Sequence, residues 1–127
     1  MAVRSERVVL MAVGAERRDR AIRVLARRLR EAGHDVVVGA PADAGSLLQS
    51  LGDDAPVVVG MSIGATGDGV GTLLASVRAR RGSTRVFAGG RSSSAVTTAL
   101  AHEHGVHLFS PDATTREILA WIADGPP

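Results

Sequence analysis

The sequence predicts an α/β domain in which helices cover both faces of a five-stranded parallel sheet. Three observations lead to this prediction. Short apolar runs rich in β-branched residues recur along the chain, which is typical of strands buried on both faces. Segments with apolar residues at helical spacing separate these runs, as crossover helices between parallel strands require. The length of 127 residues and the hydrophobic fraction of 45% suit a single domain with its own core.

The first strand and the first helix are separated by a sharp loop. Val8–Val13 is a continuous apolar run, and Gly14 breaks it. Ile22, Leu25 and Leu29 then recur at helical spacing, which predicts the face that the first helix turns toward the sheet. Small residues lie beside this apolar line, namely Ala21, Ala26 and Ala32.

The opposite side of the first helix is basic. It carries four regularly spaced arginines, Arg20, Arg23, Arg27 and Arg30. We interpret this stripe as a solvated face, on which Arg27 can pair with Glu31 four residues further on. Gly33 is expected to form the C-terminal cap of the helix.

Four more strands and four more helices are predicted along the rest of the chain. Apolar runs place the strands at residues 36–38, 57–62, 84–88 and 106–109. Apolar residues at helical spacing place the helices around residues 47–51, 70–77, 96–100 and 114–122. Thr114–Glu117 has the pattern of a capping box, so the last helix is expected to start there.

These elements together predict a flavodoxin-like (Rossmann-like) domain with strand order 2-1-3-4-5, a single domain over residues 1–127 with its core at about 7–122. In this order the topological switch point lies between strands one and three, where successive strands begin to be added on the other side of strand one. The loops that follow Val13, Ser62 and Ala88 then lie along one edge of the sheet, where open α/β sheets hold their ligands. We therefore expect the functional site at this edge.

Composition and charge favour a cytoplasmic protein that does not bind nucleic acid or span a membrane. All 15 basic residues other than histidine are arginine, yet the formal net charge is only +2. The only aromatic residues are Phe87, Phe109 and Trp121, which leaves little for base stacking. The chain has no cysteine, so a thiolate metal site is excluded. The first apolar run is too short for a signal or membrane segment.

The stretch Asp19–Val36 is similar to the first helix and second strand of cobalamin domains in acyl-CoA mutases. Over roughly Arg7 to Ile122, the chain resembles the cobalamin (vitamin B12)-binding domain of coenzyme-B12 mutases and of cobalamin-dependent methyltransferases. In the mutases this domain is a small subunit or a C-terminal domain. The family carries an Asp-x-His-x-x-Gly motif after strand one, in which His ligates cobalt and Asp orients that His. A Ser-x-Leu follows strand three, and Gly-Gly follows strand four.

The first motif is altered in this chain. Glu16 stands in the place of the Asp, Arg18 in the place of the His, and Ala21 in the place of the Gly. A guanidinium stays protonated and offers no lone pair, so Arg18 cannot ligate cobalt. Ala21 adds a methyl group where a glycine would let the nucleotide tail of the cofactor pass close to the backbone.

The other two motifs are partly retained. Ser62 keeps the serine that lies near the nucleotide tail in the family, whereas Gly64 replaces the leucine. Gly89 and Gly90 keep the glycine pair, which would let a flat ring lie on the strand ends. The resemblance therefore implies a cofactor site made by Ser62, Gly64, Gly89 and Gly90 together with the altered first motif.

Three functions are consistent with this pattern. The first is a stand-alone cobalamin-binding-type domain that binds cobalamin without a protein His ligand, as a carrier or small subunit beside a separate mutase or methyltransferase. The second is a degenerate cobalamin domain that binds no B12 and acts as a regulatory or structural partner, with a catalytic subunit or as a homo-oligomer. The third is a site for another anionic ligand, such as a nucleotide or an acyl-CoA phosphate, at the arginine-rich and glycine-rich loops.

Catalysis by this chain alone is not predicted. No Ser-His-Asp arrangement or carboxylate pair can be placed from the sequence. His102, His104 and His107 are interpreted as surface histidines, because the first two point to different sides of a helix and the third belongs to the next strand. A phosphoacceptor receiver domain is disfavoured, since no acidic pair follows strand one and the chain has no lysine.

Overall fold

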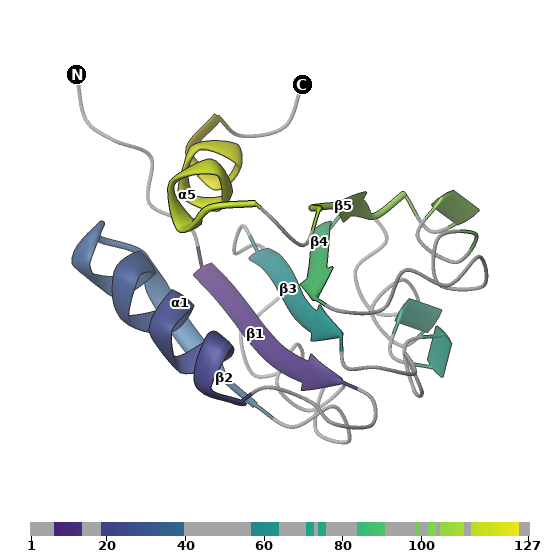
Figure 1. Ribbon diagram of the computed structural model, residues 1–127, viewed down its shortest axis with the longest axis horizontal. Coiled ribbons are helices and arrows are strands. Elements are labelled where there is room, and N and C mark those ends of the chain that lie inside the picture. Colours follow the sequence, from purple (N-terminus) through teal and green to yellow (C-terminus); the bar gives the residue numbers. More distant parts are fainter. Residues whose placement is uncertain are drawn as a thin grey trace.

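The structure is a computed structural model of the 127-residue chain. It describes residues 7–13, 19–39, 57–63, 71–72, 74–75, 84–90, 99, 102–103, 105–110 and 113–124. Figure 1 shows a central sheet with helices packed against it. The predicted second helix, around residues 47–51, lies outside the described residues, and the third and fourth helices are described only in short pieces.

Five parallel strands form the sheet, in the predicted order β2-β1-β3-β4-β5 (Figure 1). The strands are β1 (Arg7–Val13), β2 (Asp35–Val38), β3 (Val57–Ile63), β4 (Arg85–Gly90) and β5 (His107–Leu108). The arrowheads of β1, β3 and β4 point to the same edge of the sheet in Figure 1. The flavodoxin-like α/β fold expected from the sequence is thereby confirmed.

The strand boundaries differ from the prediction by one residue at an end of β1, β2 and β3, and by more in β4 and β5. β4 runs on through Gly89 and Gly90, which were expected to follow the strand, because Ser62 and Ile63 of β3 continue the ladder beside them. β5 is only two residues long, half of the predicted length, and its two side chains are exposed. The glycine pair is therefore part of the sheet edge itself.

Strand β1 is buried on both of its faces. Val8, Val9, Leu10 and Met11 of β1 are each at most 1% exposed. Because β1 pairs with both β2 and β3, its successive side chains point alternately to two covered faces of the sheet. This explains why the sequence of β1 is a continuous apolar run.

Helix α1 (Asp19–Glu31) covers one of these faces. Ile22, Ala26 and Leu29 are buried against the sheet, and Leu25 is half-buried beside them. In Figure 1, α1 lies across β2 and beside β1. Two of the alanines that were expected beside this apolar line, Ala21 and Ala32, are exposed, because they lie past the edge of the buried stripe.

The end of α1 is a Schellman motif built on Gly33. Gly33 has a φ of 94°, a left-handed conformation that side chains rarely adopt. The backbone N–H of Gly33 donates to the carbonyl of Arg30 at 3.0 Å, and the N–H of His34 donates to the carbonyl of Leu29 at 3.1 Å. The predicted glycine cap is confirmed.

Helix α5 (Thr115–Asp124) packs on the same face of the sheet as α1. Its Ile122 is fully buried in the cluster that also contains Leu29 of α1 and Phe87 of β4. The backbone N–H of Glu117 donates to the hydroxyl of Thr114 at 3.2 Å, which is the N-cap half of the predicted capping box. We call the face covered by α1 and α5 the α1/α5 face.

Candidate functional site

Three small residues lie side by side where β1, β3 and β4 end. Ala12 pairs with Ser62, and Ser62 pairs with Gly89, so the three residues form one row across neighbouring strands. Side chains that are neighbours across parallel strands share a face, and Ala12 belongs to the cluster beneath α1. This small-residue row (Ala12, Ser62 and Gly89) therefore lies at the carboxyl edge of the α1/α5 face.

The row is partly accessible. Ala12 is 7% exposed, whereas Ser62 and Gly89 are half-buried. A Cβ atom added at Gly89 would lie 3.8 Å from Cβ of Phe109, which is an ordinary van der Waals contact. The row thus combines a side chain of minimal size on each strand with one hydroxyl group that can donate and accept hydrogen bonds.

The next row toward the strand starts is filled by an aromatic ring. Leu10, Gly60 and Phe87 are neighbours across β1, β3 and β4, and the ring of Phe87 lies over Gly60. A Cβ atom at Gly60 would collide with that ring. The ring packs edge-on against Phe109, with centroids 5.8 Å apart, and against Trp121, with centroids 5.5 Å apart. The rings of Phe87, Phe109 and Trp121 therefore lie next to the small-residue row, and we call them the aromatic floor.

Arg85 fixes α5 to this floor. Its guanidinium lies 4.2 Å from the ring centroid of Trp121. It also donates hydrogen bonds to the carbonyl oxygens of Trp121 at 2.6 Å and Ile122 at 3.2 Å. The imidazole of His107, which pairs with Phe87 across β4 and β5, also stacks on Trp121 at a centroid distance of 5.3 Å. These contacts hold the C-terminal end of α5 against the start of β4.

Sequence reasoning missed Arg85, although one signal was available. The last turn of α5 contains no basic residue. The C-terminal carbonyls of a helix need hydrogen-bond donors, and a cation there is favourable to the helix dipole. An arginine at the start of a neighbouring strand is a candidate for this role, but its distance of 36 residues from Trp121 hides the pairing.

Four of the predicted site residues are among the described residues, and two of these four are direct neighbours. Ser62 and Gly89 are direct neighbours, and Gly90 pairs with Ile63 at the same edge. Ala21 is exposed in the first turn of α1. The remaining predicted site residues lie outside the described residues: Glu16, Arg18 and Gly64. The part of each residue in cofactor binding stays a prediction.

The described residues contain no cluster of three or more histidine, cysteine, aspartate or glutamate side chains that could hold a metal ion. His102 and His107 are both exposed, in agreement with their interpretation as surface histidines. Within the same described ranges, no helix is long and apolar enough to cross a membrane.

No protein-family model matches this sequence, and no curated protein matches it. Several solved structures share its fold. The Methanosarcina barkeri monomethylamine corrinoid protein superposes with a TM-score of 0.72 at 16% sequence identity. That match covers 94% of this chain and 57% of the corrinoid protein, so this chain spans little more than half of that protein's length.

Response regulators share the fold to a similar degree. A CheY-like response regulator from Mesorhizobium loti has a TM-score of 0.65 at 17% identity, over 94% of this chain and 97% of its own. A response regulator from Burkholderia multivorans has a TM-score of 0.66 at 17% identity, over 96% of this chain and 97% of its own. The comparisons therefore establish a flavodoxin-like fold that corrinoid proteins and response regulators have in common.

Proposed function

We propose that this chain is a cobalamin-binding-type domain that serves as a carrier or small subunit for a separate B12-dependent mutase or methyltransferase. It would bind cobalamin without a protein His ligand to cobalt. The observation that carries the proposal is the small-residue row of Ala12, Ser62 and Gly89 at the carboxyl edge. That edge is where open parallel sheets of this order hold their ligands.

The residues of the row fit one side of a flat, bulky ring system. A macrocycle can approach the strand ends closely only where no large side chain projects, and Ala12 and Gly89 meet that condition. The hydroxyl of Ser62 supplies a hydrogen-bonding group between them. Cobalamin, when bound, supplies radical or group-transfer chemistry, and this chain would hold and orient it for the partner.

The aromatic floor and Arg18 together support binding with the cofactor's own benzimidazole still on cobalt. A nucleotide tail inserted past Ser62 and Gly89 along this face would meet the ring of Phe87 over Gly60. At the sequence level, Arg18 stands where the family has its cobalt-ligating histidine. Both features disfavour the mode in which a histidine replaces the lower base and the tail enters the domain.

The same two features favour a second candidate function. A chain that lacks the histidine and fills the space beneath the row with aromatic rings can also be a degenerate cobalamin domain. Such a domain would bind no B12 and would act as a regulatory or structural partner. This alternative predicts self-association or a stable partner in the absence of any cofactor.

The fold shared with response regulators does not lead to a receiver function here. Phosphoryl transfer to a side chain with Mg²⁺ needs carboxylates near the strand ends. β1, β3 and β4 contain no aspartate or glutamate, no acidic pair follows strand one, and the chain has no lysine. We therefore do not propose phosphoacceptor chemistry.

Titration with hydroxocobalamin and adenosylcobalamin tests the proposal. Saturable binding should change the visible spectrum of the cofactor and raise the melting temperature of the protein, because a ligand of the folded state stabilises it. The bound spectrum should be that of cobalamin with its lower base on cobalt. If neither the spectrum nor the melting temperature changes at large excess, the proposal is wrong and the degenerate alternative gains support.

Gly89→Leu tests whether cobalamin binds at the small-residue row. A leucine there would project from the β4 end of the row, so cobalamin affinity should fall by at least about tenfold, equivalent to about 1.4 kcal/mol. Val24→Leu, on the exposed side of α1, also introduces a leucine but away from the row, and should leave the affinity unchanged. Equal affinities of the two folded variants would place the binding site elsewhere.

A further inference from the structure

The positive charge of the chain is concentrated on α1. This helix carries five arginines against two acids, Asp19 and Glu31. Its net charge is therefore +3, and since the whole chain has a formal net charge of +2, all other residues together carry −1. Eight residues of α1 are exposed, among them Arg30 and Glu31 near its C-terminal end. We call the other six the α1 arginine face: Arg20, Ala21, Arg23, Val24, Arg27 and Arg28.

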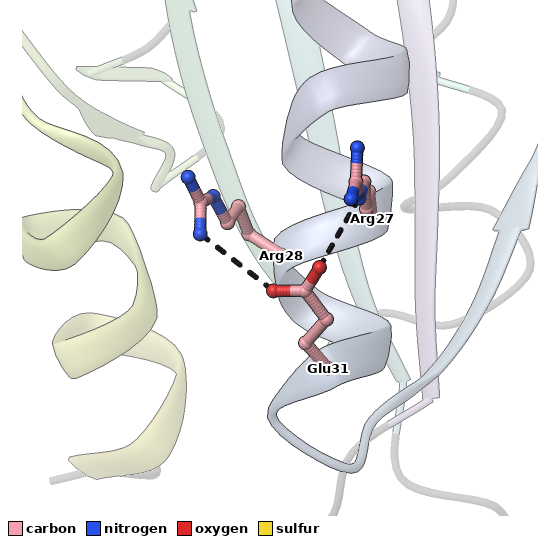
Figure 2. Close-up of polar contacts among 3 residues, drawn as sticks. All are labelled: Arg27, Arg28 and Glu31. Atoms are coloured by element: carbon pink, nitrogen blue, oxygen red, sulfur yellow. Dashed lines mark hydrogen bonds and ion pairs between the residues drawn. The ribbon is translucent and has the colours of Figure 1, made fainter.

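One carboxylate serves two of these arginines. Glu31 accepts a hydrogen bond from Nε of Arg27 at 3.1 Å and forms an ion pair with Nη1 of Arg28 at 3.6 Å (Figure 2). Arg20 and Arg23 form no ion pair with any side chain that the structure describes. The α1 arginine face therefore has an excess of guanidinium groups over the carboxylates available on its own helix.

An apolar residue lies in the middle of these cations. Val24 is 48% exposed, the largest value among the described large hydrophobic residues. Arg20 and Arg28 lie one helical turn before and after it, and Arg27 lies three residues on. Exposed Ala21 lies three residues before it. An apolar centre with a charged rim is the anatomy of a protein–protein interface, in which arginine is enriched.

We propose that the α1 arginine face docks on a protein partner whose surface has an apolar centre surrounded by aspartates or glutamates. Guanidinium groups pair with carboxylates through two parallel hydrogen bonds, which matches the planar groups that this face presents. The proposal is independent of cobalamin binding, because α1 presents this face away from the sheet and the small-residue row.

Two observations favour an acidic protein over a nucleic acid. Apart from its arginines and two acids, α1 contains only alanine, valine, leucine and isoleucine, so no amide, hydroxyl or aromatic side chain supplements the arginines in sugar or base contacts. The exposed Val24 would also face the phosphates of a nucleic acid without any gain, whereas it can be buried against an apolar residue of a protein.

The test uses the full chain and a defined probe. The probe is a fluorescein-labelled helical peptide made of glutamates, with leucines at helical spacing along one face. Fluorescence anisotropy at about 50 mM salt should show saturable binding, which weakens as salt screens the charges. The double variant R20E/R23E should bind at least about tenfold more weakly. The control R116E, at an exposed arginine of α5, should stay within about twofold.

The apolar centre has its own test. Val24→Ser should weaken binding of the leucine-containing peptide but not of a polyglutamate of the same length. The proposal is overturned if the chain does not bind the leucine-containing peptide, or if R20E/R23E and R116E bind it equally. It is also overturned if duplex DNA of matched charge binds more tightly and loses affinity in R20E/R23E. Circular dichroism confirms that each variant is folded.

Discussion

At the scale of single residues, the close approach of Gly60 and Phe87 shapes the candidate site. Phe87 can lie flat over β3 only because Gly60 has no side chain. The ring of Phe87 thus lies one row closer to the strand starts than Ser62 and Gly89, and it limits how deeply a ligand can enter along this face. Neither residue was singled out in the sequence, because a glycine inside an apolar strand gives no indication of which partner it accommodates.

Gly60→Ala is expected to destabilise the fold. The new methyl group would overlap the ring of Phe87, and overpacking of this kind costs about 1–3 kcal/mol. Urea unfolding at equilibrium measures the change in the free energy of unfolding. Gly89→Ala is the matched control, since its Cβ atom would meet Phe109 at 3.8 Å, and its effect should be smaller. Equal destabilisation by the two substitutions would refute the close contact.

Arg85→Met is expected to loosen α5. The substitution keeps much of the side-chain volume but removes two hydrogen bonds to helix carbonyls and the contact with the Trp121 ring. The expected loss in the free energy of unfolding is about 2 kcal/mol. Arg116→Met, at an exposed position of the same helix, should change it by less than about 0.5 kcal/mol.

The fluorescence of Trp121 reports on the same contact. This residue is the only tryptophan of the chain, and it is half-buried in contact with Arg85 and His107. In Arg85→Met its emission should shift toward longer wavelength, because the end of α5 becomes more accessible to water. An unchanged emission together with an unchanged free energy of unfolding would show that Arg85 does not anchor the helix.

At the scale of elements, local rules predicted the helix ends well and the strand ends poorly. Gly33 was expected as the cap of α1, and the backbone hydrogen bonds confirm it. The Arg27–Glu31 pair, expected from a spacing of four residues, is present at 3.1 Å. Strand ends depend instead on distant partners: β4 extends to Gly90 only because Ile63 of β3 lies beside it. No local signal contains that information.

Thr114→Ala tests the cap of α5. It removes the hydroxyl that accepts the N–H of Glu117 at 3.2 Å, and the loss of an N-cap costs about 1 kcal/mol. Thermal unfolding followed by circular dichroism gives the change in stability. Thr114→Ser keeps the hydroxyl and should retain most of the stability. If alanine is tolerated as well as serine, the hydroxyl does not cap the helix.

At the scale of the whole molecule, the topology could be predicted from the sequence and the function could not. The alternation of buried strands and crossover helices leaves few parallel arrangements, and the order 2-1-3-4-5 was correct. The same fold serves a corrinoid protein and response regulators at similar sequence identity, so it does not select among functions. The choice depends on the side chains at the carboxyl edge.

Only some of the residues at that edge could be predicted from the sequence. Ser62 and Gly89 were predicted at the edge from their places at the strand ends, and the register adds that they are direct neighbours with Ala12. The aromatic floor beneath them required the structure, because Phe87, Phe109 and Trp121 come from separate elements.

The most direct test of the central claim is an amide chemical-shift map of the ¹⁵N-labelled chain titrated with hydroxocobalamin. The predicted result is a set of saturable shifts centred on Ala12, Ser62 and Gly89, with little change at the opposite ends of the strands, near Arg7 and Arg85. The absence of shifts at saturating cofactor, or shifts centred away from the small-residue row, would contradict the account.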